Sequence, residues 1–153
     1  MDTIHTRIAT VADVEVIAPL FDAYRQFYEK APDLNLARRF IGDRLKNGES
    51  IVILASNASQ QIVGFCQLYP TFCSVDATTI YTLYDLFVTP TARRSGAGKA
   101  LLLAAQKLAV DNGKARMDLS TAKTNQSAQL VYESLGWIRD EVFYTYSLSV
   151  EPR

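Results

Sequence analysis

The chain has 153 residues, of which 48% are hydrophobic and 21% charged, an ordinary balance for one globular domain spanning residues 1–153 with a substantial core. Its 16 basic and 16 acidic residues cancel, which argues against a nucleic-acid-binding or membrane-surface protein. Two cysteines and one histidine argue against a disulfide framework and a zinc site. Without a long apolar run, the sequence predicts a cytoplasmic protein that needs no metal.

Strand-like and helix-like patterns alternate along the chain. In order, they predict a strand at 3–9, helices at 14–28 and 34–46, a hairpin of strands 50–56 and 61–69, a loop through Pro70, Phe72 and Cys73, a strand at 78–88, a helix at 95–112, a strand at 116–121, a short helix after Asn125 and a last strand at 138–148. This order predicts a mixed α/β protein with helices on the faces of one sheet.

The most informative segment is the turn at residues 93–99, between the strand ending at Val88 and the next helix. Such a turn directs backbone N–H groups to one spot, and the helix start adds partial positive charge there, so the segment favours a phosphate or pyrophosphate. Glycine at positions 96 and 98 lets an anion approach the amides. A glycine-rich helix start without a ligand is the alternative.

The spacing of the turn distinguishes between phosphate motifs. A Walker loop requires glycine where Arg93 stands and Ser or Thr where Ala100 stands, and a dinucleotide fingerprint requires glycine at Leu101. The pattern present is Arg-x-x-Gly-x-Gly, formed by Arg93, Gly96 and Gly98. In this pattern the chain resembles the GNAT family of N-acetyltransferases, whose pyrophosphate loop reads Arg/Gln-x-x-Gly-x-Gly/Ala.

A second block strengthens the resemblance. Asn125, Ala128, Tyr132 and Gly136 match the family's Asn-x-x-Ala-x-x-x-Tyr-x-x-x-Gly-Phe pattern, with Trp137 in place of Phe. Physically the block is a short helix with an N-cap at its start and a glycine stop at its end. The resemblance covers nearly the whole chain and implies the acyl-CoA N-acyltransferase fold, a mostly antiparallel sheet with about four helices.

The resemblance implies acetyl-CoA as co-substrate. Its pantetheine arm is expected to pair with the backbone of the strand ending at Val88, and its pyrophosphate to lie on the turn. The implied coenzyme-binding residues are Leu86, Phe87, Val88, Arg93, Arg94, Ser95, Gly96, Ala97, Gly98, Lys99, Asn125 and Ala128.

Acetyl transfer to an amine requires a neutral amine. A primary amine has a pKa of about 10.4, so removing its proton at pH 7 costs about 4–5 kcal/mol and calls for a general base. Asp85 is the candidate, because it lies in the strand next to the implied thioester site. The polyamine-acetylating branch has Glu one position earlier, where this chain has Tyr84, so Asp85 as a structural residue or substrate anchor is the alternative.

Departure of the thiolate needs less help, since a thiol has a pKa of about 8.5. Tyr132 matches the family's proton donor. Candidates for the substrate pocket are Tyr24, Tyr28, Glu29, Tyr69, Phe72 and Tyr81.

These features predict direct transfer to a small-molecule amine such as a polyamine or amino acid, in a ternary complex. A protein acetyltransferase and a non-catalytic acyl-CoA-binding module are the alternatives. The resemblance also implies a homodimer, in which the last strand with Tyr144 and Tyr146 is a candidate interface.

Overall fold

The computed structural model describes residues 3–152, which form two compact units divided between Ser120 and Thr121. The first unit contains strands β1 (His5–Ile8), β2 (Ile51–Ser56), β3 (Ile62–Cys73), β4 (Thr78–Val88) and β5 (Met117–Asp118), helices α1 (Val14–Phe27), α2 (Leu34–Lys46) and α3 (Ala97–Asp111), and short 3₁₀ turns η1 (Val11–Asp13) and η2 (Pro90–Ala92). The second unit contains helix α4 (Gln126–Ser134).

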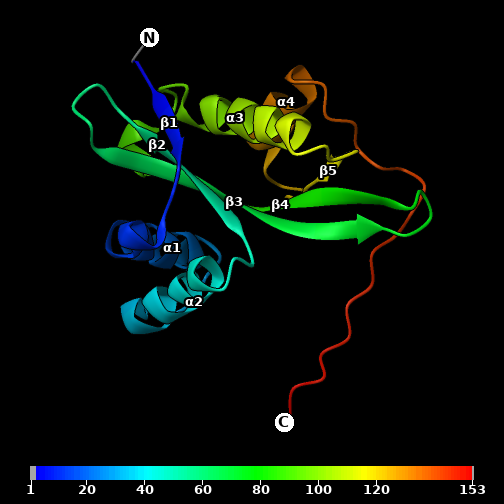
Figure 1. Ribbon diagram of the computed structural model, residues 1–153, viewed down its shortest axis with the longest axis horizontal. Helices are drawn as coiled ribbons and strands as arrows, with labels where there is room; N and C mark the ends of the chain where they lie inside the picture. Colours follow the sequence, from blue (N-terminus) through cyan, green and yellow to red (C-terminus); the bar gives the residue numbers. More distant parts are fainter. Residues whose placement is uncertain (1–2, 153) are drawn as a thin grey trace. The chain divides into compact units, whose positions relative to one another are not determined.

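The five strands of the first unit form one sheet in the order β1-β2-β3-β4-β5. All neighbours are antiparallel except β4 and β5, which are parallel. Helices α1 and α2 lie on one side of this sheet and α3 on the other (Figure 1). The predicted mixed α/β architecture is therefore confirmed.

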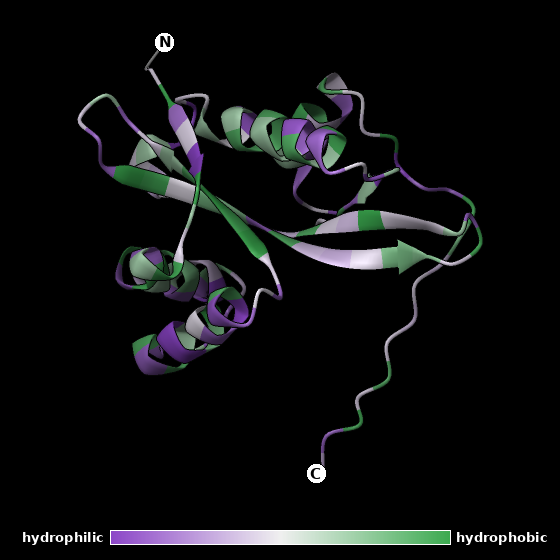
Figure 2. Cartoon of the chain, in the orientation of Figure 1, coloured by the Kyte–Doolittle hydropathy of each residue, from purple (hydrophilic) through white to green (hydrophobic). Residues whose placement is uncertain are grey.

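The core between the sheet and helices α1 and α2 is apolar and aromatic. Ile17 and Phe21 of α1 and Ile41 of α2 are buried against Leu54 of β2 and Phe65 of β3. The ribbon coloured by hydropathy shows hydrophobic stretches along β2 and β3 (Figure 2). Four consecutive residues of β2 are buried, because helices cover both faces of the sheet.

On the other face, α3 packs closely against β3 at Gly64. A Cβ added to Gly64 would lie 2.7 Å from the Phe87 carbonyl oxygen and 3.4 Å from Leu101 Cδ1. Only glycine leaves enough room for this approach, so Gly64 sets how closely β3, β4 and α3 pack at the end of β4.

Strand β3 is longer than predicted. The sequence predicts a loop from Pro70, but β3 continues to Cys73, which pairs with Thr78 of β4. Pro70 is tolerated because the pairing of β2 with β3 ends at Leu68, so the proline nitrogen is not needed for a hydrogen bond to β2. The loop prediction there is wrong, and Phe72 lies exposed on this extended hairpin.

A β-bulge interrupts the register of β3 and β4. Gln67 pairs with Asp85 and Leu68 with Leu83, which leaves Tyr84 as the extra residue of β4. Since side chains alternate along a strand, a bulge reverses which face the following residues occupy. Asp85 consequently lies on the α1 face, although its sequence spacing from Leu83 would otherwise put both on one face.

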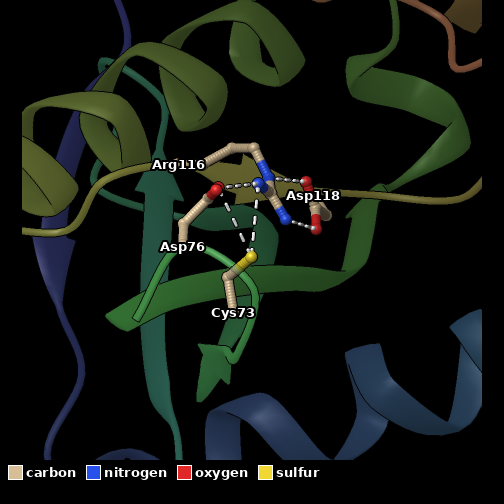
Figure 3. A network of polar contacts seen from close by, with 4 residues as sticks. All are labelled: Cys73, Asp76, Arg116 and Asp118. Atoms are coloured by element: carbon tan, nitrogen blue, oxygen red, sulfur yellow. Dashed lines mark hydrogen bonds and ion pairs between the residues drawn. The ribbon is translucent and has the colours of Figure 1, made fainter. Parts of the chain in front are cut away.

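Strand β5 pairs with β4 over a short stretch and is held by a polar network at the far end of the β3–β4 hairpin. Arg116 binds Asp118 through Nε and Nη2, at 2.8 and 3.1 Å, and its guanidinium also lies 3.6 Å from Asp76 and 3.8 Å from Cys73 Sγ (Figure 3). This network links β5 to the turn between β3 and β4.

In the second unit, α4 is capped as predicted. The Asn125 side chain accepts a hydrogen bond from the Ala128 amide, and Gly136, with φ of 92°, ends the helix. The strand predicted at residues 138–148 is wrong, because these residues form no strand in the structure. Their alternating pattern gives strand propensity, but a strand also requires a partner for its backbone groups, and residues 138–148 make no backbone–backbone hydrogen bond within the described chain.

Candidate active site

One side of β4 is open near its carboxyl end. Strand β5 pairs with β4 only at Tyr81 and Thr82, and no strand among residues 3–152 pairs with residues 83–88 on that side. On the opposite side, β3 follows β4 to Val88. Backbone groups of residues 83–88 are thus available to an extended ligand, as the family resemblance implies for Leu86, Phe87 and Val88. The Phe87 side chain itself is buried.

The turn after β4 presents unbonded amides. The first backbone hydrogen bond of α3 runs from the Ala100 amide to the Gly96 carbonyl, so the amides before it have no carbonyl partner within the helix. Within the described chain, the N–H groups of Arg94, Gly96, Gly98 and Lys99 have no acceptor, whereas Ser95 and Ala97 make weak contacts at 3.4 and 3.3 Å. The turn therefore offers amides to an anion.

The backbone of the turn explains its glycines. Gly96 precedes α3 with φ of 93°, and Arg94 also has a positive φ of 64°. A Cβ at Gly96 or Gly98 would meet no atom closer than 3.9 Å, so the space beside the amides is open. Because Gly98 has no positive φ, a side chain there would add bulk in this space without backbone strain.

Arg93 contacts the protein rather than the amides of the turn. Its Nε donates a hydrogen bond to the Val88 carbonyl at 3.2 Å, and its guanidinium lies 5.6 Å from the Phe27 ring centroid and 5.9 Å from that of Phe87. The side chain thus connects the end of β4 to α1 and contributes positive charge beside the turn.

Asp85 is a buried carboxyl with an unusual environment. It is 4% exposed, and its Oδ2 accepts a hydrogen bond from Gln67 Nε2 at 2.5 Å. The Ser50 hydroxyl in turn donates to Gln67 Oε1 at 2.7 Å. Burial raises the pKa of Asp85, and hydrogen bonds from Gln67 and Tyr24 oppose this effect. A carboxyl with a raised pKa is suited to proton exchange.

Three of the predicted pocket tyrosines gather near Asp85. The Tyr24 hydroxyl donates to the Tyr84 carbonyl at 3.3 Å and lies beside the Asp85 carboxyl, which together with burial raises the Tyr24 pKa. Tyr28 packs edge-on against Tyr24 at 5.2 Å, and Tyr69 packs edge-on against Tyr84 at 5.7 Å. Burial, with a contribution from Asp85, raises the pKa of Tyr69 to about 12.

Tyr81 is not brought to this group. It precedes the bulge and is nearly fully buried on the α3 face, where its hydroxyl accepts a hydrogen bond from Asn112 Nδ2 at 2.7 Å. Gln67 and Ser50 were not among the predicted site residues, although a glutamine inside the apolar run of β3 is a visible signal of a buried polar contact.

In the second unit, the Asn125 side chain caps α4, and the Ala128 amide is the group that it caps. Tyr132, in the same helix, packs against Trp137 with ring centroids 6.2 Å apart. The Trp137 amide donates to the Tyr132 carbonyl, which closes the helix end around Gly136. The aromatic at position 137 is thus a packing partner of Tyr132.

Neither a cluster of metal-ligating side chains nor a membrane-spanning helix is present among the residues that the structure describes. Residues 3–152 contain no cluster of three or more His, Cys, Asp and Glu side chains able to hold a metal ion. None of their helices combines the length and the apolar character that crossing a bilayer requires.

An open strand edge followed by a turn with unbonded amides is the arrangement that the resemblance implies for the coenzyme. A family model described as "Acetyltransferase (GNAT) family" matches residues 17–137. The chain belongs to the GNAT family of acetyltransferases. It is accordingly an acyltransferase, and members of this family use acetyl-CoA as the acetyl donor.

Individual GNAT proteins extend the comparison. The chain is 45% identical over 144 residues to "Uncharacterized N-acetyltransferase YhfO" of Bacillus subtilis, covering 94% of this chain and 96% of that protein. A crystal structure of a "probable acetyltransferase" is 35% identical, with a TM-score of 0.90, and the match covers 97% of this chain and 99% of the other. An aminoglycoside acetyltransferase from a soil metagenome, 20% identical with a TM-score of 0.77 over 95% and 97% of the chains, shares the fold.

Proposed function

We propose that this protein transfers the acetyl group of acetyl-CoA to a primary amine of a small molecule, by direct attack in a ternary complex. The observation that carries the proposal is the open side of β4 between Leu83 and Val88, which ends at unbonded amides and contains the buried Asp85. The composition of the whole chain favours a cytoplasmic enzyme.

The first unit supports binding of the donor in two ways. The backbone of Leu86, Phe87 and Val88 would pair with the amides of the pantetheine arm, as an added strand does. The turn from Arg93 to Lys99 would hold the pyrophosphate through the amides of Arg94, Gly96, Gly98 and Lys99, with positive charge from the arginine and lysine side chains.

Asp85 would serve as general base, directly or through a water molecule. Its environment raises the pKa from the ordinary carboxyl value, which improves the match to proton transfer from an ammonium group. Its carboxylate gains no positive charge from a neighbouring side chain, so a cationic amine would be the first positive charge beside it.

The aromatic group formed by Tyr24, Tyr28, Tyr69 and Tyr84 supports a cationic acceptor. The hydroxyls of Tyr24 and Tyr69 have raised pKa values and stay neutral near pH 7, so the rings can attract an ammonium ion through their π faces. Tyr28 and Tyr84 are 47% and 67% exposed, which makes them the members of this group that an incoming amine would contact first.

Residues of the second unit complete the proposal by family resemblance. Tyr132 would donate a proton to the departing thiolate of coenzyme A, and Asn125 and Ala128 would contact the coenzyme. Cys66 is not suited to act as a nucleophile, because it is buried and burial raises the pKa of its thiol to about 12.

The direct test is release of free thiol from acetyl-CoA in the presence of candidate acceptors. The panel contains polyamines, amino acids, aminoglycosides and lysine peptides, each with an acceptor-free control. Turnover with a small amine supports the proposal. Turnover with peptides alone would make the protein a protein acetyltransferase, and coenzyme binding without any turnover would make it a binding module.

We also propose that the protein is a homodimer. Between residues 138 and 150, the exposed large apolar side chains are Ile138, Val142, Phe143, Tyr144, Tyr146, Leu148 and Val150. A run of this kind is unfavourable in water and is a candidate strand for pairing with a second copy. Light scattering should give the mass of two chains for the wild type and of one chain after Phe143→Ser with Tyr146→Ser. A monomeric wild type would contradict this proposal.

A further inference from the structure

A buried polar chain reaches Asp85 from Ser50, the residue before β2, across β3. Ser50, Gln67 and Asp85 are 7%, 0% and 4% exposed, and they are linked by two hydrogen bonds of 2.7 and 2.5 Å. Burying three polar side chains in succession is costly unless each is satisfied. Their arrangement therefore calls for an explanation beyond packing.

The direction of the Gln67 amide follows from its two neighbours. Its Oε1 accepts from the Ser50 hydroxyl and its Nε2 donates to Asp85 Oδ2. Turning the amide over would place its oxygen against the Asp85 carboxylate, which repels it. The Asp85 carboxylate thus selects the orientation in which Gln67 donates to it, and the Ser50 hydroxyl supports this orientation by donating to the amide oxygen.

On the basis of the proposed function, we propose that Gln67, oriented by Ser50, is a positioning residue that holds Asp85 in place and keeps its carboxyl ionised for proton abstraction. The chain of contacts runs from the residue before β2, through β3, to β4. The amide donor would offset part of the cost of burying the carboxylate.

The groups that stabilise the ionised form of Asp85 are neutral hydrogen-bond donors. The titratable groups around Asp85 are Tyr24 from α1, Cys66 and Tyr69 from β3 and the neighbouring Tyr84. The charge of Asp85 helps to raise the pKa of Tyr24, Cys66 and Tyr69, so these three groups are neutral near pH 7. The charged side chains of Arg44 and Glu49 act on Tyr69 and pair with each other at 3.0 Å. Only the Gln67 and Tyr24 hydrogen bonds lower the Asp85 pKa.

The test is the pH dependence of kcat/KM for Gln67→Met, which keeps the length of the side chain but removes the donor. Because loss of the donor raises the Asp85 pKa, the acid limb of the profile should move to higher pH. At pH values within the acid limb, the variant should have a lower kcat/KM than the wild type. On the plateau at higher pH, its kcat/KM should return to most of the wild-type value. Ser50→Ala should move the limb in the same direction by a smaller amount.

A matched control separates positioning from stability. Leu102→Ala removes a side chain that is 1% exposed and belongs to α3, the helix on the sheet face opposite to α1 and α2. It should lower the melting temperature without moving the acid limb. The same amine is used throughout, so its own ionisation is common to all profiles.

A direct readout does not depend on turnover. The Asp85 carboxyl carbon, assigned by its loss in Asp85→Asn, is titrated by ¹³C NMR in wild type, Gln67→Met and Ser50→Ala. A higher midpoint in both variants supports the inference. Unchanged midpoints would overturn it even if the wild type acetylates amines. If no amine is acetylated, the proposed function fails. Raised titration midpoints in the two variants would then show only that Gln67 and Ser50 set the ionisation of Asp85.

Discussion

The two sides of β4 differ in what covers them. One side is paired with β3 along the strand and is closed by the approach of Gly64 to the Phe87 carbonyl. The other side is paired only at Tyr81 and Thr82 and then lies open toward the turn at residues 93–99. The same strand is therefore a scaffold along one edge and a candidate binding site along the other. The bulge at Tyr84 places the Asp85 carboxyl on the α1 face of this strand.

The largest expected effect comes from removing the carboxyl beside the open edge. Asp85→Asn keeps the shape and should lower kcat/KM for an accepted amine by about 10²–10⁴-fold, with the Kd for acetyl-CoA nearly unchanged. Steady-state kinetics and calorimetry provide the two measurements. Asp22→Asn is the matched control, since Asp22 is also buried but accepts hydrogen bonds from Gln26 and the Asp33 amide. Equal losses in both variants would point to a structural role for Asp85.

Tyr132→Phe tests the proton donor of the second unit. Because a thiolate leaves with modest help, we expect kcat to fall by about 10²-fold, at the low end for general acids, with little change in acetyl-CoA affinity. Steady-state rates against the same amine check this. An unchanged kcat would remove Tyr132 from the mechanism, and Trp137→Phe serves as a control for the ring packing at this helix end.

Gly64→Ala adds a methyl group on the closed side of β4. Since its Cβ would lie 2.7 Å from a backbone oxygen, β3 must shift, and the free energy of unfolding should fall by about 1–3 kcal/mol. Chemical denaturation measures this change. A variant as stable as wild type would show that the two strands can separate here.

Gly98→Val adds a side chain on the open side of β4, where space is available. It should leave stability nearly unchanged but raise the Kd for acetyl-CoA about tenfold or more, equivalent to about 1.4 kcal/mol. Gly42→Ala in α2, whose Cβ would make an ordinary 3.8 Å contact with Val14, is the control. Wild-type affinity in Gly98→Val would contradict the pyrophosphate assignment. Gly96→Val is less informative, because φ of 93° strains any side chain.

The smallest expected effect is on the pH dependence of stability. The pKa of Asp85 is raised in the folded state, so this group disfavours folding progressively as the pH rises from the unfolded carboxyl pKa through the folded one. Asp85→Asn removes this contribution, and its melting temperature should exceed that of wild type above this window and approach it below. A difference in melting temperature between Asp85→Asn and wild type that is the same at every pH would contradict the effect of burial on Asp85.

Local patterns were sufficient for most elements of the fold. The helices, the β2–β3 hairpin and the glycine turn follow from periodicity, caps and turn residues, which act within a few positions along the chain. The strand expected at 138–148 was wrong because pairing depends on a partner that local pattern does not specify. The early end predicted for β3 at Tyr69 was wrong for a similar reason. Pro70 is tolerated in the strand because it lies beyond the last residue of β3 that pairs with β2.

By itself, the sequence determined the family and most of the elements of this protein, because spacing motifs and hydrophobic periodicity are properties of the chain. Only the tertiary structure decided that Asp85 lies on the sheet face that carries α1 and Tyr24, and that it accepts a hydrogen bond from Gln67. It also decided that Tyr81 lies on the opposite face of the sheet. The physical reason is the single extra residue at Tyr84, which reverses the alternation of the strand and depends on its pairing with β3.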